Sequence, residues 1–191
     1  MDAIILAGGE NRRFQSHKAL VEIRGRKLIE KTSELLLRHF GAVHINTNTP
    51  ELFFYLGLPL IGDIFKQRSP MTGIYSSLVS TGASELFFAA CDMPFIEGDV
   101  IELIKGQFCG QDAVLAADKG VPQPLLGIYS RRLIPELERR LNQNRKAMWD
   151  LLPDIAVDLV PERAMSAVDP EGRSFMNFNT VEEYRDLIIP V

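Results

Sequence analysis

The stretch Ile4-Ile5-Leu6-Ala7-Gly8-Gly9 decides the fold of this chain, together with the cations Arg12, Arg13 and Lys18 that follow it. An apolar run that ends in a glycine pair and then gathers positive charge is typical of a buried strand leading into an anion-binding loop. Glycines let the backbone take positive φ and approach a ligand closely, and successive N–H groups in such a turn bind anions. The alternative is an ordinary strand–loop–helix turn with solvated basic residues, because short motifs also occur by chance.

Two common nucleotide-binding motifs are absent from this loop. No Gly-Lys-Ser or Gly-Lys-Thr follows the glycines, so the loop is not a P-loop. No G-x-G-x-x-G follows the strand either, which argues against a dinucleotide site. Arginines and a lysine are nevertheless the charges that a triphosphate needs. The sequence therefore favours a nucleotide loop of a third type.

Length and composition indicate an ordinary globular protein of one domain, residues 1–191. The chain has 46% hydrophobic and 24% charged residues and a net charge of -4, which does not favour a nucleic-acid-binding protein. Two cysteines are too few for a disulfide framework, and we expect them to be reduced. No signal peptide or membrane span is recognisable. We expect a cytoplasmic protein that binds neither nucleic acid nor membranes and is monomeric or weakly oligomeric.

The hydrophobic pattern predicts an α/β fold with a mostly parallel sheet. Almost entirely apolar strands alternate with amphipathic helices, which is typical of a sheet covered on both faces, a three-layer arrangement. We predict strands at 3–6, 42–45, 58–61, 86–90 and 113–117, and helices at 27–40, 71–79 and 100–108. The last third differs: we predict an edge strand at 125–129, helices at 133–141, 146–152 and 181–188, a half-exposed strand at 155–160, and loops at 143–145 and 161–173.

Small or polar residues follow the first four predicted strands. They are Gly8 and Gly9, then Asn46, Asp63 and Asp92. Ligands of open α/β sheets lie outside the carboxyl ends of the strands, so these positions are candidate binding residues. The alternative is that they are simply polar loop residues.

The two aspartates are candidates for different ligands. Asp92 at a strand end could hold Mg2+ together with substrate phosphates, or it could cap the helix expected near Gly98. Asp63 could accept two hydrogen bonds from a guanine, and Asn46 could contact a base, but both residue types are also common in turns. No zinc-binding spacing and no activated serine or cysteine is visible. Nucleotidyl transfer needs no such nucleophile, since positioning and charge neutralisation supply most of the catalysis.

These motifs together resemble those of the molybdenum cofactor guanylyltransferases. The signature Leu-Ala-Gly-Gly-x-x-x-Arg-Met-Gly-x-Asp-Lys-x-Leu of that family aligns with residues 6–20, where the glycine pair, Arg13, Lys18 and Leu20 match. The resemblance spans nearly the whole chain and continues through segments 25–29, 70–74, 91–95, 123–125 and 175–180. It implies a single-domain, Rossmann-like nucleotide-diphosphosugar-transferase fold, with a nucleotide-binding half at about 1–110 and a pterin-binding half at about 111–191.

The resemblance also implies a reaction and its residues. GMP would be transferred from GTP to molybdopterin or the molybdenum cofactor, giving the guanine dinucleotide and pyrophosphate, with Mg2+ as cofactor. Molybdoenzymes that accept the product, or their chaperones, are implied partners. The implied catalytic residues are Arg13, Lys18 and Asp92, with Asp92 also the metal ligand. The GTP-binding residues would be Leu6, Ala7, Gly8, Gly9, Lys18, Asn46, Asp63 and Asp92, and the pterin-binding residues Gln123, Pro124, Asn177 and Asn179.

Two positions in the loop depart from the family pattern. Gln15 replaces a glycine and His17 replaces an aspartate, which changes both backbone freedom and charge beside the phosphates. Two alternatives therefore stay open: a nucleotidyltransferase of the same fold that uses CTP or another acceptor, and a nucleotide-binding homologue with weakened catalysis.

Overall fold

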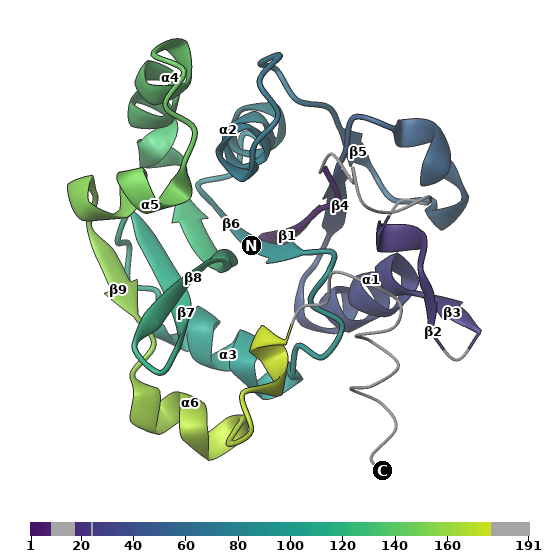
Figure 1. Cartoon of the computed structure of the whole chain (residues 1–191), viewed down its shortest axis with the longest axis vertical. Helices are drawn as coiled ribbons and strands as arrows, with labels where there is room; N and C mark the ends of the chain where they lie inside the picture. Colours follow the sequence, from purple (N-terminus) through teal and green to yellow (C-terminus); the bar gives the residue numbers. More distant parts are fainter. Residues whose placement is uncertain (9–17, 24, 177–191) are drawn as a thin grey trace.

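The computed structural model describes residues 1–8, 18–23 and 25–176. Within these residues the central sheet has the strand order β5-β4-β1-β6-β8-β7-β9, and a small hairpin stands apart from it (Figure 1). The strands of the sheet are β1 (Asp2–Leu6), β4 (Val43–Asn46), β5 (Leu60–Ile61), β6 (Glu85–Ala90), β7 (Ala113–Asp118), β8 (Val121–Ser130) and β9 (Val157–Leu159). The hairpin pairs β2 (Glu22–Ile23) with β3 (Arg26–Lys27).

Helices cover both faces of the sheet, as the sequence predicts. They are α1 (Leu28–His39), α2 (Pro70–Thr81), α3 (Gly98–Gln107), α4 (Ile134–Asn142), α5 (Met148–Leu151) and α6 (Glu162–Val168). In Figure 1, α2, α4 and α5 lie on one side of the strands and α1, α3 and α6 on the other. The three-layer α/β class predicted from the alternating strands and helices is confirmed.

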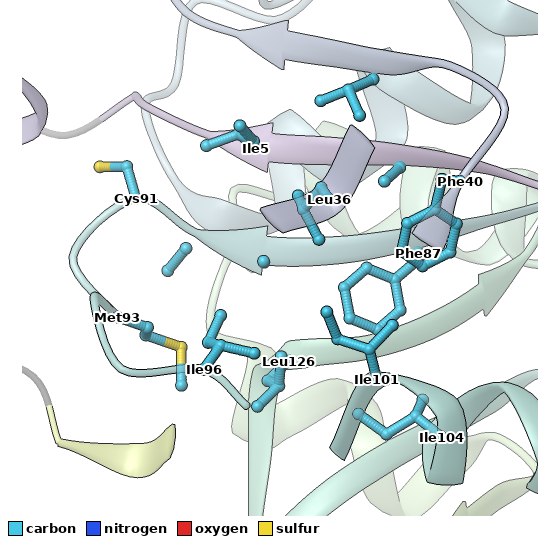
Figure 2. Close-up of a cluster of buried hydrophobic side chains, with 14 of the residues drawn as sticks. Ile5, Leu36, Phe40, Phe87, Cys91, Met93, Ile96, Ile101, Ile104 and Leu126 are labelled. Atoms are coloured by element: carbon cyan, nitrogen blue, oxygen red, sulfur yellow. The ribbon is translucent and has the colours of Figure 1, made fainter. Parts of the chain in front are cut away.

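Alternating side chains of the strands form two separate cores. Ala3 and Ile5 of β1 face α1 and α3, while Ile4 and Leu6 face α2. Figure 2 shows the first core, in which the rings of Phe40 and Phe87 are 4.8 Å apart at their centroids. Because every residue of β1 after Asp2 is buried, this strand is fixed between two helix layers.

The position predicted for β8 is wrong. The sequence predicts an edge strand at 125–129, but β8 lies inside the sheet, antiparallel to both β6 and β7. Leu126, Ile128 and Tyr129 are buried because helices cover both faces there as well. The edge on this side is β9, which pairs in parallel with β7. Strand order depends on long-range pairing, which the local pattern does not encode.

The segment predicted as a loop at 161–173 is also different in the structure. It contains α6 and leads into a 3-10 turn at Arg173–Phe175. Met165 of α6 is buried in the first core, with Ala164 and Val168 packed against it. A helix of seven residues is too short for its periodicity to be recognised in the sequence. Tertiary packing, rather than intrinsic helix propensity, stabilises it. The helix predicted at 181–188 lies outside the described residues.

The remaining predictions agree within a few residues, although the helix predicted at 146–152 is α5 followed by a 3-10 turn at Leu152–Asp154. Among the helices of the described ranges, none is long and apolar enough to cross a membrane. Cys91 is buried and Cys109 is exposed, and within the described residues neither forms a disulfide.

Gly127 in the centre of β8 provides a test of the interior strand. A Cβ at this position would lie 2.3 Å from the carbonyl oxygen of Val114 on β7. We expect Gly127→Ala to lower the free energy of unfolding by about 1–3 kcal/mol, because the strands must separate to admit the methyl group. Urea denaturation measures this. Gly106→Ala on α3, where a Cβ meets nothing within 4 Å, is the control and is expected not to destabilise. An unchanged stability of Gly127→Ala would contradict the β7–β8 register.

Candidate functional site

The carboxyl ends of β1, β4 and β6 are joined by backbone hydrogen bonds. Ala7 N–H donates to the carbonyl of Asn46 (2.9 Å), and Cys91 N–H donates to the carbonyl of Leu6 (3.1 Å). The chain proceeds from β1 outward to β4 and β5, and then returns to β6 on the other side of β1. The strand order therefore reverses between β1 and β6, which is where open α/β sheets bind their ligands.

Candidate residues follow the strands in a single row along this edge. Asp63 follows β5, Asn46 ends β4, Gly8 follows β1 and Asp92 follows β6. Leu6 and Ala7 are buried, whereas Gly8 is exposed and offers its backbone to a ligand. With neighbouring strands about 4.8 Å apart, the row from Asp63 to Asp92 covers about 14 Å. The structure thus brings together these site residues that the sequence singled out.

Asp63 is held by two asparagines at one end of the row. Asn46, which is 2% exposed, donates from Nδ2 to Asp63 Oδ1 (3.2 Å) and to the carbonyl of Ile61 (3.2 Å). Asn48 Nδ2 donates to Asp63 Oδ2 (2.6 Å), and its Oδ1 accepts from Asp63 N–H (3.1 Å). Each carboxylate oxygen keeps a further lone pair. The carboxylate is therefore fixed in orientation and still able to accept hydrogen bonds.

Gly73 allows this arrangement. It lies in the first turn of α2, where a Cβ would be 2.5 Å from Asn46 Oδ1 and 2.9 Å from Leu6 Cδ2. The segment 70–74, which carries part of the family resemblance, thus acts through close backbone approach: the absence of a side chain at Gly73 leaves room for the amide of Asn46.

Asp92 lies at the reversal point and is partly buried. The N-cap of α3 is Glu97, so Asp92 does not cap that helix, and this alternative from the sequence is excluded. Among the described residues no group of three or more histidines, cysteines, aspartates or glutamates is placed to hold a metal ion. A carboxylate oxygen is a ligand type that Mg2+ accepts, provided that phosphates and water complete the coordination.

A cavity of about 370 Å3 extends from Asp92 away from Asp63. Gln123 and Pro124 at the start of β8 line it, as do Lys146 and Trp149. The structure thus joins Asp92 to two of the predicted pterin-binding residues. Sequence reasoning missed Lys146 and Trp149. A tryptophan three residues after a lysine was the available signal, but nothing local linked it to Asp92.

An irregular pairing of β8 places Gln123 and Pro124 at this cavity. Leu115 of β7 pairs with Gly127 and Ala117 pairs with Pro122, so the one β7 residue between these pairs lies opposite four residues of β8. Tyr129 Oη donates to the carbonyl of Pro124 (2.7 Å) across the bulge. Burial raises the pKa of this phenol, so it stays protonated and can donate. The bulge therefore redirects the strand into the site.

The buried Arg140 holds α5, which forms the wall of the cavity opposite Gln123 and Pro124. The fully buried side chain of Arg140 donates to the carbonyl of Asp150 (2.8 Å) and forms ion pairs with Glu136 and Asp154. Hydrogen bonds from Arg139 and then from Arg140 lower the pKa of Glu136 to about 2, so this carboxylate is charged at neutral pH. Met148 and Leu151 of α5 are buried in the second core.

A second cavity, about 380 Å3, lies beside the β7–β8 hairpin and α6. Its lining includes the carboxylates of Asp118, Glu162 and Glu171, with Lys119 as a cation. Such a negative lining would repel a phosphorylated ligand. The cavity at Asp92 is therefore the better candidate for an anionic substrate.

For the other predicted site residues, the structure describes no side chain. Gly9, Arg13, Asn177 and Asn179 lie outside the described residues, as do Gln15 and His17. Lys18 begins the 3-10 turn Lys18–Leu20, and its backbone alone is described. Their roles stay predictions.

The fold and the edge site define the class, an open α/β protein whose candidate site lies at the carboxyl ends of its strands. A family model described as "MobA-like NTP transferase domain" matches residues 3–157. The chain is 36% identical over 188 residues to a molybdenum cofactor guanylyltransferase of Desulfosudis oleivorans, covering 96% of this chain and 93% of the relative. It is 31% identical to a probable molybdenum cofactor guanylyltransferase of Peptoclostridium acidaminophilum, covering 96% and 86%. The chain belongs to the MobA-like NTP transferase family.

A solved structure agrees with this assignment. The molybdopterin-guanine dinucleotide biosynthesis protein A of Archaeoglobus fulgidus superimposes with a TM-score of 0.82 at 28% identity. The alignment covers 97% of this chain and 95% of that protein. The nucleotidyltransferase fold expected from the sequence is confirmed over nearly the whole length.

The Asn46–Asp63 contact can be tested through its pH dependence. Asn46→Asp places a second carboxylate against Asp63, which raises the pKa of the pair in the folded state. We therefore expect lower unfolding free energy than wild type at pH 7, and a smaller deficit as the pH falls and a proton is taken up. Urea denaturation at several pH values measures this.

Asn46→Ala is the matched control, because it removes the same hydrogen bonds without adding charge. Its deficit, about 1–3 kcal/mol for the unsatisfied partners, should change less with pH than that of Asn46→Asp. Equal pH dependence of the two variants would contradict the contact.

Proposed function

We propose that this protein transfers the guanylyl group of GTP to molybdopterin or the molybdenum cofactor, forming the guanine dinucleotide and pyrophosphate. The observation that carries this proposal is the order of groups along the carboxyl edge: Asp63, Asn46, Gly8, Asp92 and then Gln123. Along this edge, a carboxylate for the base, an exposed backbone segment for the nucleotide, a carboxylate for the metal and a cavity for the acceptor follow one another. GTP and an acceptor would lie in the same order when their reacting groups meet. The names of the relatives supply the identities of the two substrates.

Asp63 is assigned to the guanine base. A carboxylate accepts two hydrogen bonds from the ring N–H and the exocyclic amino group of guanine, and no other common base offers this pair of donors. Asn46 and Asn48 hold the carboxylate, and a cavity of about 250 Å3 lined by Asn48, Asp63 and Arg68 lies beside it. The base would lie at this end, and the ribose and phosphates would extend toward Gly8.

Asp92 is assigned to the reacting phosphates and to Mg2+. It follows β6, one of the two strands between which the strand order reverses, and it also lines the acceptor cavity. When bound there, Mg2+ supplies charge neutralisation at the phosphate oxygens. Lys18, by family resemblance, would add a second positive charge on the nucleotide side.

The acceptor is assigned to the cavity beyond Asp92. Lys146 supplies a positive charge among the described lining residues, suited to the terminal phosphate of molybdopterin. The amide of Gln123 can donate to and accept from a pterin ring. An oxygen of the terminal phosphate would attack the α-phosphorus in line, and the bond to the β-phosphate would break, releasing pyrophosphate. The protein contributes position and charge rather than a covalent intermediate.

Nucleotide selectivity tests the assignment of Asp63. With Mg2+, we expect GTP to raise the melting temperature more than CTP or inosine triphosphate, which lacks the exocyclic amino group. Asp63→Asn should raise the Kd for GTP about tenfold to a hundredfold, because the amide cannot accept both donors. It should also reduce discrimination between GTP and inosine triphosphate. Stabilisation by CTP and not by GTP would instead support the cytidylyl alternative.

Turnover tests the assignment of Asp92. Asp92→Ala should lower kcat by about a hundredfold or more, through loss of the metal ligand. Its urea denaturation curve should stay close to wild type. Pyrophosphate release from GTP and molybdopterin is the readout. Asp99→Ala, an exposed carboxylate in the first turn of α3, serves as control and should retain activity. Near-normal activity of Asp92→Ala would refute the metal assignment, and tight GTP binding without turnover in the wild type would favour the weakened homologue.

A further inference from the structure

Trp149 is a large aromatic side chain that the fold leaves uncovered at a cavity. It is 55% exposed and lines the cavity that also contains Asp92, Gln123 and Lys146. Tryptophan is normally among the more buried residues, and its ring offers a flat face for stacking. The indole therefore presents an exposed face, at the edge of a partly polar cavity, on which a ligand ring can stack.

The backbone that carries Trp149 is fixed on both sides. The neighbouring residue Met148 is buried in the second core, and the carbonyl of the following residue Asp150 accepts from the buried guanidinium of Arg140 (2.8 Å). α5 has four residues, so these contacts rather than helix propensity hold it in place. A ligand that stacks on Trp149 would meet a preorganised platform and lose little affinity to ordering the backbone.

The groups around the indole favour a planar, polar ring with an attached phosphate. Gln123 offers both a donor and acceptors for ring heteroatoms, and Lys146 offers a cation for a phosphate. The guanine reader Asp63 lies after β5, at the other end of the row from β8. The nucleotide base is therefore assigned elsewhere, and the acceptor is the substrate left for this platform.

We propose that Trp149 stacks on the pterin ring of the acceptor and determines its affinity. This inference rests on the proposed function, since the proposed acceptor provides the pterin. The indole would cover one face of the ring, while Gln123 bonds to its edge. Trp149 acts in binding and takes no part in bond making or breaking.

The chain itself provides a probe of this contact. Trp149 is its single tryptophan, so intrinsic tryptophan fluorescence reports on this site alone. We expect titration with a pterin monophosphate, without GTP, to quench the fluorescence saturably. Inorganic phosphate and GTP with Mg2+ are the control titrations and should change it much less. Equal quenching by GTP would assign the indole to the nucleotide and overturn the proposal.

Kinetics with paired variants separate stacking from structure. Trp149→Ala should raise the acceptor KM about tenfold to a hundredfold, the usual effect of losing a stacked aromatic ring. The KM for GTP and the melting temperature should be nearly unchanged. Trp149→Phe should keep most of the acceptor affinity, since it retains a stacking face. Phe54→Ala, another exposed aromatic residue outside this cavity, is the matched control and should leave both KM values unchanged.

The outcomes distinguish this inference from the proposed function. If the wild type makes the dinucleotide and Trp149→Ala has an unchanged acceptor KM, the stacking proposal is wrong while the function stands. If the wild type releases no pyrophosphate with GTP and molybdopterin, the proposed function fails. In that case, saturable quenching by the pterin probe would still support the platform, and its absence would refute it.

Discussion

The hydrogen bonds that join the ends of β1, β4 and β6 are the constraint on which the site depends. Ala7 bonds to the carbonyl of Asn46, and Cys91 bonds to the carbonyl of Leu6. A slip by one residue in either pairing would turn every side chain of that strand to the opposite face. Both cores prevent such a slip, since alternate residues of β1 are buried on each side. The same packing that stabilises the sheet therefore sets the positions of Gly8 and Asp92.

Residues distant in the chain complete the site because β8 runs antiparallel to its neighbour β6. Its first residues lie at the edge where β6 ends, so Gln123 and Pro124 lie beside Asp92. The bulge closed by Tyr129 and the buried Arg140 fix the two walls of the cavity. Neither residue needs to contact a substrate in order to position those that do. Rigid support of this kind holds binding groups in register.

Sequence patterns were sufficient to predict those elements whose buried residues recur at a regular spacing. The apolar run at Ile4–Leu6 and the alternation of strands and helices identified the α/β class and most elements. The patterns failed where long-range packing decides the outcome. β8 has a short apolar segment like an edge strand, yet partners on both sides bury it. α6 has too few residues for a period, and its contacts through Met165 stabilise it.

The sequence by itself determined the class of fold, the glycine loop and the residues after each strand, because these depend on local composition and periodicity. It also identified Asp63 and Asp92 as candidates, since a carboxylate after a buried strand is visible in one dimension. Only the tertiary structure decided that Asn46 and Asn48 orient Asp63, and that Lys146 and Trp149 share a cavity with Asp92. Such neighbours come from strand order and crossover packing, which combine residues from 15 to 57 positions apart. Local sequence carries no record of those contacts.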